Sequence, residues 1–187
     1  VYENGVTRSL TVSITITVAD ANNPSITTSR TYSGINVSIT VYERPPIIFD
    51  LDGDGIELIS PDVSTTMFDM DDDGDKDRTG WVGADDGFLA LDRNGDGIIN
   101  SASEISFVDD LEGATTDLEG LKAFDSNDDD VLDANDDQFG EFLVWQDVNS
   151  NGISEEGELK TLTERGITSI NLIGTPTNDD PGVDENV

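Results

Sequence analysis

The sequence predicts an α+β fold in which an N-terminal antiparallel β-hairpin or meander packs on a module of short helices, short strands and polar loops. Three observations support this prediction. Apolar and polar residues alternate strictly within parts of residues 1–44, as they do in half-buried strands. Repeated Asp/Asn/Gly runs separate short apolar segments within residues 45–173. Two segments of that region place apolar residues at helical spacing.

The N-terminal segment is predicted to contain two or three strands. Residues 10–18 and 35–42 alternate in polarity, residues 27–32 are a further candidate strand, and residues 20–24 form a turn cluster. Two or three strands are not stable by themselves in water. We therefore expect residues 1–44 either to belong to the same domain as the residues that follow or to complete a sheet elsewhere in a larger protein.

The boundary to the next region falls at Pro45 and Pro46, because consecutive prolines interrupt regular structure. The module predicted after this boundary spans residues 45–173. Near its end, residues 167–173 alternate in polarity and predict a strand. Residues 174–187 are mostly Thr, Asn, Asp, Pro and Gly, which indicates a tail or a linker.

Two helices are predicted in the module. Residues 117–124 place apolar side chains on one face, with Asp117 as the expected N-cap. Residues 154–165 form the second candidate helix, with Gly166 at the C-cap position. Both segments are short, so the sequence predicts a fold in which loops and strands outweigh helices.

The charge of the chain limits what it can bind. Forty-one Asp and Glu residues against nine Lys and Arg residues give a net charge of −32 over 187 residues, yet 35% of the residues are hydrophobic. Such a chain repels itself and stays unfolded unless bound cations cancel the charge. The same charge argues against nucleic acid or an anionic membrane surface as a partner, and no apolar run predicts membrane insertion.

Cysteine and histidine are both absent from the sequence. Without cysteine there is no disulfide, and without histidine the chain lacks the usual general base, the common nucleophile systems and imidazole metal ligands. We therefore expect a domain that is not an enzyme. A glycosidase that uses two carboxylates is compatible with so many acidic residues, but metal-bound carboxylates stay ionised and cannot act as the general acid.

Five segments have the spacing of an EF-type calcium loop, in which oxygen ligands come from positions 1, 3, 5, 7, 9 and 12, and glycine occupies position 6. Position 7 contributes its backbone carbonyl. We number these segments loops 1 to 5 in chain order. The candidate ligands are Asp50, Asp52, Asp54 and Glu57 in loop 1; Asp69, Asp71, Asp73, Asp75 and Asp77 in loop 2; Asp92, Asn94, Asp96, Ile98, Asn100 and Glu104 in loop 3; Asp125, Asn127, Asp129, Val131, Asp133 and Asp136 in loop 4; and Asp147, Asn149, Asn151, Ile153, Glu155 and Glu158 in loop 5.

The loops differ in how well they match this spacing. Loop 5 matches best, because Glu158 falls at position 12, on the second predicted helix. Loop 3 places Glu104 one residue late, and loop 4 has Asp130 in place of glycine. Any one run is equally well explained as a solvated turn, but five in one acidic chain are not. We expect about five Ca²⁺ ions rather than Mg²⁺, which requires a rigid octahedron and retains water.

Two further features concern the surroundings of the loops. An isoleucine follows the glycine in three of them (Ile56, Ile98 and Ile153) and is expected to anchor the loop in the core while its carbonyl faces the ion. Asp85 and Asp86 form either a further ligand pair or an ordinary turn, and the sequence leaves both alternatives open.

The loop-bearing region resembles the calcium-dependent self-processing module of RTX-type secreted bacterial proteins. The resemblance rests on residues 48–57, 79–87, 91–99, 144–153 and 157–162. It implies that calcium folds the module and triggers cleavage of an Asp-Pro bond at its start, where the Asp side chain attacks its own peptide carbonyl. Pro46 matches the proline of that bond, but Pro45 precedes it and has no carboxylate. This chain therefore lacks the cleavage site of the family it resembles.

A second resemblance concerns large RTX adhesins. The size, acidity and lack of cysteine are similar to those of their calcium-dependent peptide-binding domain, and residues 1–44 resemble their extender repeats. This resemblance implies a secreted or bacterial cell-surface protein that acts in cell adhesion and biofilm formation. The implied partners are a peptide or protein C-terminus on another cell and the neighbouring adhesin domains. We expect the domain to be a monomer.

Three residues are candidate contacts for such a ligand: Trp81, Asp109 and Asp110. Core packing is the commoner situation for a tryptophan, and a solvated surface is the commoner one for the two aspartates. Two other functions stay open. The domain is either a calcium-rigidified spacer that binds no ligand, or a degenerate self-processing module.

Overall fold

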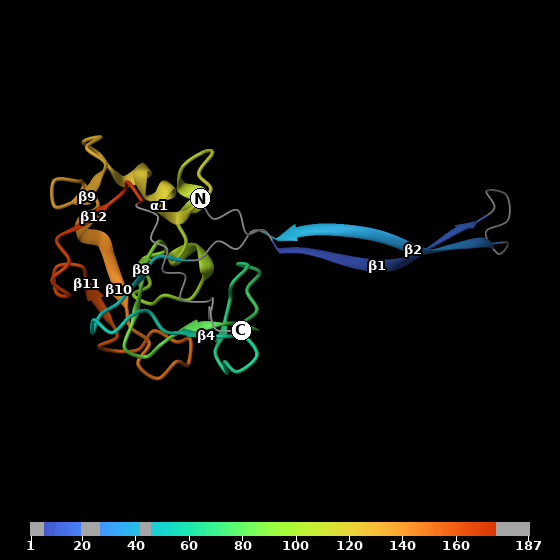
Figure 1. Cartoon of the computed structure of the whole chain (residues 1–187), viewed down its shortest axis with the longest axis horizontal. Coiled ribbons are helices and arrows are strands. Elements are labelled where there is room, and N and C mark those ends of the chain that lie inside the picture. The colour runs from blue at the N-terminus through green and yellow to red at the C-terminus, as the bar shows by residue number, and fades with distance from the viewer. Residues whose placement is uncertain (1–5, 20–26, 42–45, 175–187) are drawn as a thin grey trace, which may run out of the picture. The chain divides into compact units, whose positions relative to one another are not determined.

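The computed structural model describes residues 6–19, 27–41 and 46–174, and it divides the chain into two compact units, Val1–Glu43 and Arg44–Val187 (Figure 1). Small antiparallel sheets and a few short helices make up the described residues, which agrees with the predicted mixed α and β content. The predicted turn at 20–24, the Pro45 side of the boundary and all but the start of the predicted tail lie outside the described residues.

The described part of the first unit is a long antiparallel hairpin. Strand β1 (Val6–Ala19) pairs with β2 (Thr27–Val41), and the register shifts once, between Val12 and Ile14. The alternating pattern therefore predicted the pairing correctly. The two candidate strands at 27–32 and 35–42 are one continuous strand, so the hairpin alternative is confirmed over the meander.

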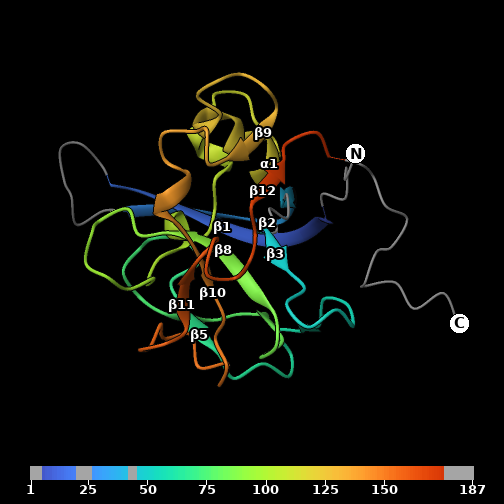
Figure 2. The same cartoon turned by 90° about the vertical axis from the view of Figure 1, so that its left-hand side faces the viewer.

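A four-stranded antiparallel sheet forms the centre of the second unit, in the order β11-β10-β8-β3 (Figure 2). Its strands are β3 (Ile48–Phe49), β8 (Gly87–Leu91), β10 (Phe142–Trp145) and β11 (Leu159–Thr161). Every residue of β8 is buried. This continuous apolar run is typical of a strand that is covered on both faces.

The two faces of this sheet belong to two hydrophobic cores, because successive side chains of a strand point to opposite sides. Leu89 and Leu91 of β8 lie in one core, with the aromatic residues Phe107, Phe124 and Phe142. The other core contains the alternate residues of β8 together with the aromatic cluster Phe68, Trp81, Phe88 and Trp145. The central sheet thus supports elements on both of its sides.

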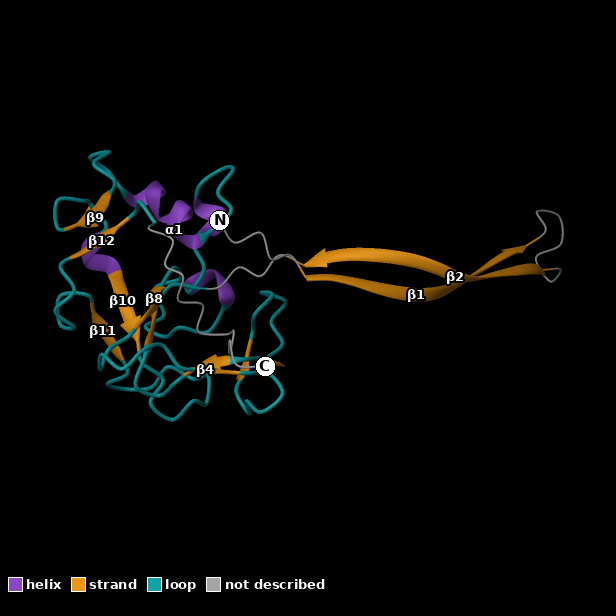
Figure 3. Ribbon diagram, in the orientation of Figure 1, coloured by secondary structure: helices purple, strands orange, loops and turns teal. Residues whose placement is uncertain are grey.

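Three two-stranded pairs surround the central sheet. Strand β4 (Leu58–Ile59) pairs with β7 (Trp81–Val82), and β5 (Met67–Phe68) pairs with β6 (Asp77–Arg78). Strand β9 (Val131–Asp133) pairs with β12 (Ser169–Asn171), which is the central part of the strand predicted at 167–173. In Figure 3 most of this unit is loop, as the sequence predicts.

The described helices are all short. They are η1 (Ala102–Glu104), η2 (Val108–Asp110), α1 (Asp117–Gly120), η3 (Leu121–Phe124) and η4 (Phe139–Glu141). The helix predicted at 117–124 is confirmed as α1 continued by η3, but its N-cap is Thr116, whose side chain accepts the Glu119 N–H. Asp117 instead is buried, and its Oδ1 accepts hydrogen bonds from Ser106 and from the backbone N–H groups of residues 107 and 108.

The prediction of a helix at 154–165 is wrong. Gly157 has a φ of +94°, which ends any right-handed helix there, and the next residues form β11 against β10. The Glu158 carboxylate also accepts two backbone N–H groups of its own loop, which holds this segment beside the loop. The pairing of β11 and the closure of loop 5 together outweigh the helical spacing.

Candidate metal sites and an adjacent pocket

All five loops fold into the same turn. In each loop the carboxylate at position 1 accepts a hydrogen bond from the backbone N–H at position 6, with N···O distances of 2.8 to 3.2 Å. In all but loop 2, the side chain at position 3 also accepts the N–H at position 5. The spacing therefore predicted a shared backbone geometry, including the loop that lacks the glycine.

Loop 4 keeps this turn although Asp130 occupies the glycine position. Its φ is +62°, in the same left-handed region as Gly152 at the equivalent position of loop 5, where φ is +70°. Asp enters this region more readily than most non-glycine residues. The side chain of Asp130 also accepts a hydrogen bond from Lys122 at 2.7 Å, which helps to hold the residue in place.

The position-12 carboxylates of loops 4 and 5 close their own loops. Asp136 and Glu158 each accept the backbone N–H groups at positions 2 and 9, one on each oxygen. Both side chains are buried. Position 12 is therefore an internal clamp in these two loops, next to the place where an EF-type loop holds its ion.

Loops 2, 3 and 5 lie side by side. The Thr66 hydroxyl, just before loop 2, donates to the Ser150 carbonyl of loop 5 at 2.7 Å. The Ser154 hydroxyl of loop 5 accepts the Ile99 N–H of loop 3 at 2.7 Å. An isolated bridge between Asp69 and residue 101 joins loops 2 and 3. The negative charge of three loops is thus concentrated in one region.

The expected anchoring by isoleucine at position 7 is wrong in two loops. Ile98 and Ile153 are 43% and 52% exposed, whereas the residues that follow them, Ile99 and Ser154, are 1% and 8% exposed. Neighbouring side chains of an extended segment point in opposite directions. In these two loops position 8, and not position 7, therefore faces the core.

Three groups of carboxylates converge in the described residues, and each could hold a metal ion. Within a group, one oxygen of each residue lies within 4.8 Å of the others. The groups are Asp50, Asp52 and Asp86; Glu57, Asp85 and Asp86; and Asp69, Asp71 and Asp73. Loops 3 to 5 add no further carboxylate group at this distance within residues 46–174, since several of their candidate ligands are amides and carbonyls.

Several candidate ligands are buried carboxylates that have no cationic partner among the described residues. Six candidate ligands are at least nine-tenths buried: Asp69, Asp86, Glu104, Asp136, Asp147 and Glu158. Neither ion pair found in the described ranges, Arg93–Asp110 or Lys122–Asp130, includes any of them. An ionised group that is buried without compensation is strongly destabilising. These residues therefore fit a hard divalent cation, which would supply the missing positive charge.

Negative charges gather around Glu57 at the end of loop 1. The pKa of Glu57 is raised to about 7 by desolvation and by the negative charges of Asp54, Asp86 and Asp85. At Asp50, by contrast, hydrogen bonds from the N–H groups of Gly53 and Gly55 outweigh desolvation and lower the pKa. Backbone N–H groups at the start of the loop thus stabilise the ionised form of Asp50, whereas the end of the loop lacks a positive partner.

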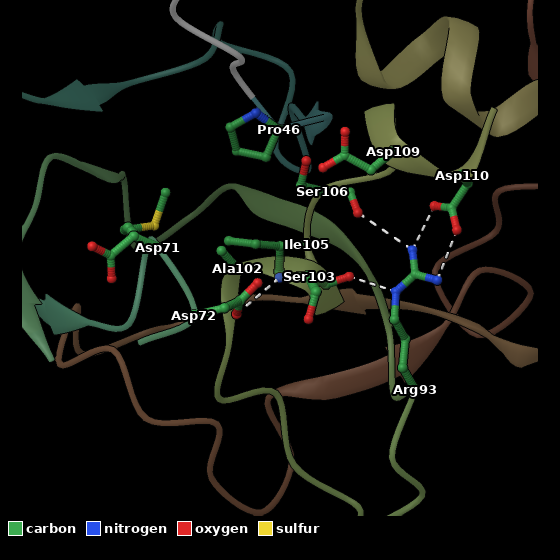
Figure 4. Close-up of a pocket in the computed structure, with 11 residues that line it drawn as sticks. Pro46, Asp71, Asp72, Arg93, Ala102, Ser103, Ile105, Ser106, Asp109 and Asp110 are labelled. Atoms are coloured by element: carbon green, nitrogen blue, oxygen red, sulfur yellow. Dashed lines mark hydrogen bonds and ion pairs between the residues drawn. The ribbon is translucent and has the colours of Figure 1, made fainter. Parts of the chain in front are cut away.

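A pocket of about 470 Å³ lies next to loop 2 (Figure 4). Asp71 and Asp72 line it on one side, and Asp109 and Asp110 line it on another. Pro46 also contributes to its wall. Two of the three predicted ligand contacts therefore meet in one cavity, together with a residue of the loop 2 carboxylate group.

Arg93 connects several residues that line one wall of this pocket. Its guanidinium forms a bidentate pair with the Asp110 carboxylate, at 2.9 and 2.6 Å, and donates to the backbone carbonyls of Ser103 and Ser106. It also lies over the Phe107 ring, 5.6 Å from the centroid. This role was not predictable from the sequence, because an isolated arginine in loop 3 has no characteristic spacing.

Trp81, the third predicted ligand contact, lies in the core instead. It is 4% exposed and packs against Phe68, Phe88 and Trp145. Its indole N–H donates to Asp147 Oδ2 at 2.8 Å. From the core, Trp81 therefore holds the side chain of Asp147, the first residue of loop 5, in place.

This contact predicts unequal effects for two similar substitutions. We expect Trp81→Phe to destabilise the chain by about 2 kcal/mol more than Trp145→Phe, because only Trp81 loses a hydrogen bond to a buried carboxylate. The Trp145 indole N–H has no hydrogen-bond partner, so its substitution removes packing alone. Urea unfolding in millimolar calcium measures the difference. Equal losses would show that the Trp81–Asp147 bond contributes nothing.

The fold and the carboxylate groups define a loop-rich domain with side chains that could hold metal ions. The SPM domain family matches residues 47–186, and the chain belongs to this family. The iron-regulated protein FrpA of Neisseria meningitidis serogroup C is 42% identical to the chain over 132 residues. The aligned region is 68% of this chain but 12% of that relative. All three carboxylate groups lie within the residues that match the family.

Proposed function

We propose that this chain is a calcium-dependent ligand-binding module of a large bacterial RTX adhesin and captures the C-termini of peptides on another cell. In this proposal the module is secreted or displayed on the cell surface, does not catalyse a reaction, and stays outside the membrane. No helix within the described ranges is long and apolar enough to cross a bilayer.

Calcium is the cation that best suits the loops. Ca²⁺ accepts six to eight oxygens from carboxylates, amides and carbonyls in a flexible geometry. The loops offer this mixture, and their position-1 carboxylates are already oriented by backbone N–H groups. The buried carboxylates that lack cationic partners support cation loading in the folded state.

The observation that carries the ligand-binding proposal is the position of Asp71. This residue belongs to the carboxylate group of loop 2 and also lines the pocket. The volume of about 470 Å³ is in the range of ligand-binding pockets. A cation in loop 2 would therefore lie at the wall of a cavity large enough for a few residues of peptide.

Charge explains why capture of a carboxylate would depend on calcium. Asp71, Asp72 and Asp109 line the pocket, and the Arg93 guanidinium is already paired with Asp110. A peptide carboxylate entering this site without a metal ion would be repelled. A Ca²⁺ ion in loop 2 offsets part of this negative charge and can accept a carboxylate oxygen in an open coordination position.

A degenerate self-processing module is the second candidate. It is favoured by Pro46, which lines the same pocket and matches the proline of the bond that the resembling family cleaves. Because Pro45 cannot supply the attacking carboxylate, the cleft would be retained without its reaction. This alternative predicts a folded, calcium-loaded domain that binds no separate peptide. A calcium-rigidified spacer predicts the same result.

Calorimetric titration of short peptides tests the proposal. We expect peptides with a free C-terminus to bind in millimolar Ca²⁺, and the same peptides to lose binding when the C-terminus is amidated or when EGTA replaces calcium. Absence of binding by every peptide, with a sample that circular dichroism shows to be folded, would contradict peptide capture and favour the spacer or the degenerate module.

A pair of variants locates the site. Ser103 is exposed and lines the pocket, so Ser103→Trp should fill the cavity and abolish binding. Ser169, an exposed residue of β12 that does not line the pocket, provides the matched control Ser169→Trp. Full binding by Ser103→Trp would exclude this pocket as the peptide site.

A further inference from the structure

Loop 1 lacks the ligand that closes loops 4 and 5. Counting from Asp50, position 12 of loop 1 is Pro61, which has no side-chain oxygen. Asp136 and Glu158 occupy this position in loops 4 and 5 and clamp the loop through backbone N–H groups. If loop 1 is a complete cation site, its closing carboxylate has to come from another segment.

The strand pairing brings one such segment beside loop 1. Loop 1 connects β3 to β4, and the turn at 83–86 connects β7 to β8. Because β3 pairs with β8 and β4 pairs with β7, both connections run between the same two strand pairs. The Gly83 N–H also donates to the Glu57 carbonyl at 2.7 Å, which fixes the turn against the end of the loop.

Asp86 in this turn has the environment of a closing ligand. Its side chain is fully buried, and its Oδ2 accepts the backbone N–H of Glu57, at position 8 of loop 1, at 2.8 Å. Its Oδ1 is buried as well and has no hydrogen-bond partner. One Asp86 oxygen lies within 4.8 Å of carboxylate oxygens of both Asp50 and Asp52.

The same pattern of contacts occurs at the other closing residues. Asp136 and Glu158 are nearly fully buried and accept a backbone N–H from the second half of their loops. Asp86 likewise accepts the backbone N–H of Glu57, although the two residues are 29 positions apart in the sequence. A buried carboxylate oxygen without a donor is strongly destabilising unless a cation or a proton satisfies it.

We propose that Asp86 is the closing ligand of the loop 1 cation site and that a hard divalent cation, Ca²⁺ in the first instance, is held by Asp50, Asp52 and Asp86. The inference rests on the calcium loading proposed above and is independent of peptide capture. It assigns to Asp86 the ligand role that the sequence left open against an ordinary turn. Binding at this site ties the connection after β3 to the connection before β8.

Calorimetric titration of the whole chain with CaCl₂ tests the assignment. We expect Asp86→Asn to bind one Ca²⁺ fewer than the unmodified chain, because the amide keeps an acceptor for the Glu57 N–H but removes the anionic oxygen. Asp62→Asn is the matched control, since Asp62 is exposed and belongs to none of the carboxylate groups. Its stoichiometry should be unchanged.

Asp52→Ala keeps the test decisive if Asp86→Asn does not fold. Asp52 is exposed, so its substitution should leave the core intact, and the loss of its side-chain oxygens should remove the same single equivalent of calcium. The double variant should lose no more than either single variant, because both substitutions destroy the same site. Full stoichiometry and affinity in Asp86→Asn, or loss of a second ion in the double variant, would overturn the assignment. An unmodified chain that binds no Ca²⁺ would instead refute the calcium loading on which it rests.

Discussion

Removal of calcium with EGTA is expected to lower the midpoint of thermal unfolding by about 15–25 °C, or to leave the chain largely unfolded at 25 °C. Extracellular calcium modules bind with a Kd of about 10⁻⁴–10⁻³ M, and each site at tenfold saturation contributes about 1.4 kcal/mol. Five such sites contribute about 7 kcal/mol, which is comparable with the whole stability of a domain. Circular dichroism measures the midpoint with and without the chelator.

The structural reason lies in the buried carboxylates. Asp86, Asp147 and Glu158 are at most 4% exposed, and no described ion pair neutralises them. Without cations the folded state must hold these charges away from water with no positive charge to offset them. Restoring Ca²⁺ should recover the midpoint, and the same concentration of Mg²⁺ should recover less of it. An unchanged midpoint in EGTA would contradict calcium-dependent folding.

The substitution Gly120→Ala is expected to destabilise the chain by about 3 kcal/mol or more. A Cβ at this position would lie 1.8 Å from the Phe107 carbonyl oxygen and 2.9 Å from the Val108 Cα. Both obstacles are backbone atoms, so no side-chain rotation relieves the clash. Helix α1 would have to move away from η2, which also borders the pocket through Asp109 and Asp110.

Gly140→Ala is the matched control for this effect. Gly140 also lies in a short helix, η4, and an added Cβ would meet nothing within 4 Å. Alanine restricts the unfolded chain more than glycine does, so this change should be neutral or stabilising by a few tenths of a kcal/mol. Urea unfolding in saturating calcium compares the two variants. Equal stability of both variants would contradict the close packing of α1 on η2.

The features that were predictable from the sequence are those set by local spacing. Period-two alternation predicted the β1–β2 hairpin, and the Asp/Asn/Gly spacing predicted five loops with one shared turn. Asp130 shows that the spacing of the ligands matters more than the glycine, because aspartate takes up the required positive φ.

The features that were not predictable depend on contacts between distant segments. Helical spacing at 154–165 did not anticipate the pairing of β11 with β10. Trp81 stands in a turn-rich stretch, and only the fold shows that its indole N–H reaches Asp147. Asp86 is 29 residues from its partner in loop 1, so its role follows from strand order and not from spacing.

A crystal structure grown in millimolar CaCl₂, with data collected at a long wavelength, tests the central claim most directly. We predict strong anomalous difference peaks within the five loops, with one peak between Asp50, Asp52 and Asp86 and another beside Asp69 and Asp71. Ordered loops without anomalous peaks would contradict calcium binding by these residues and would leave the burial of their carboxylates without a compensating charge.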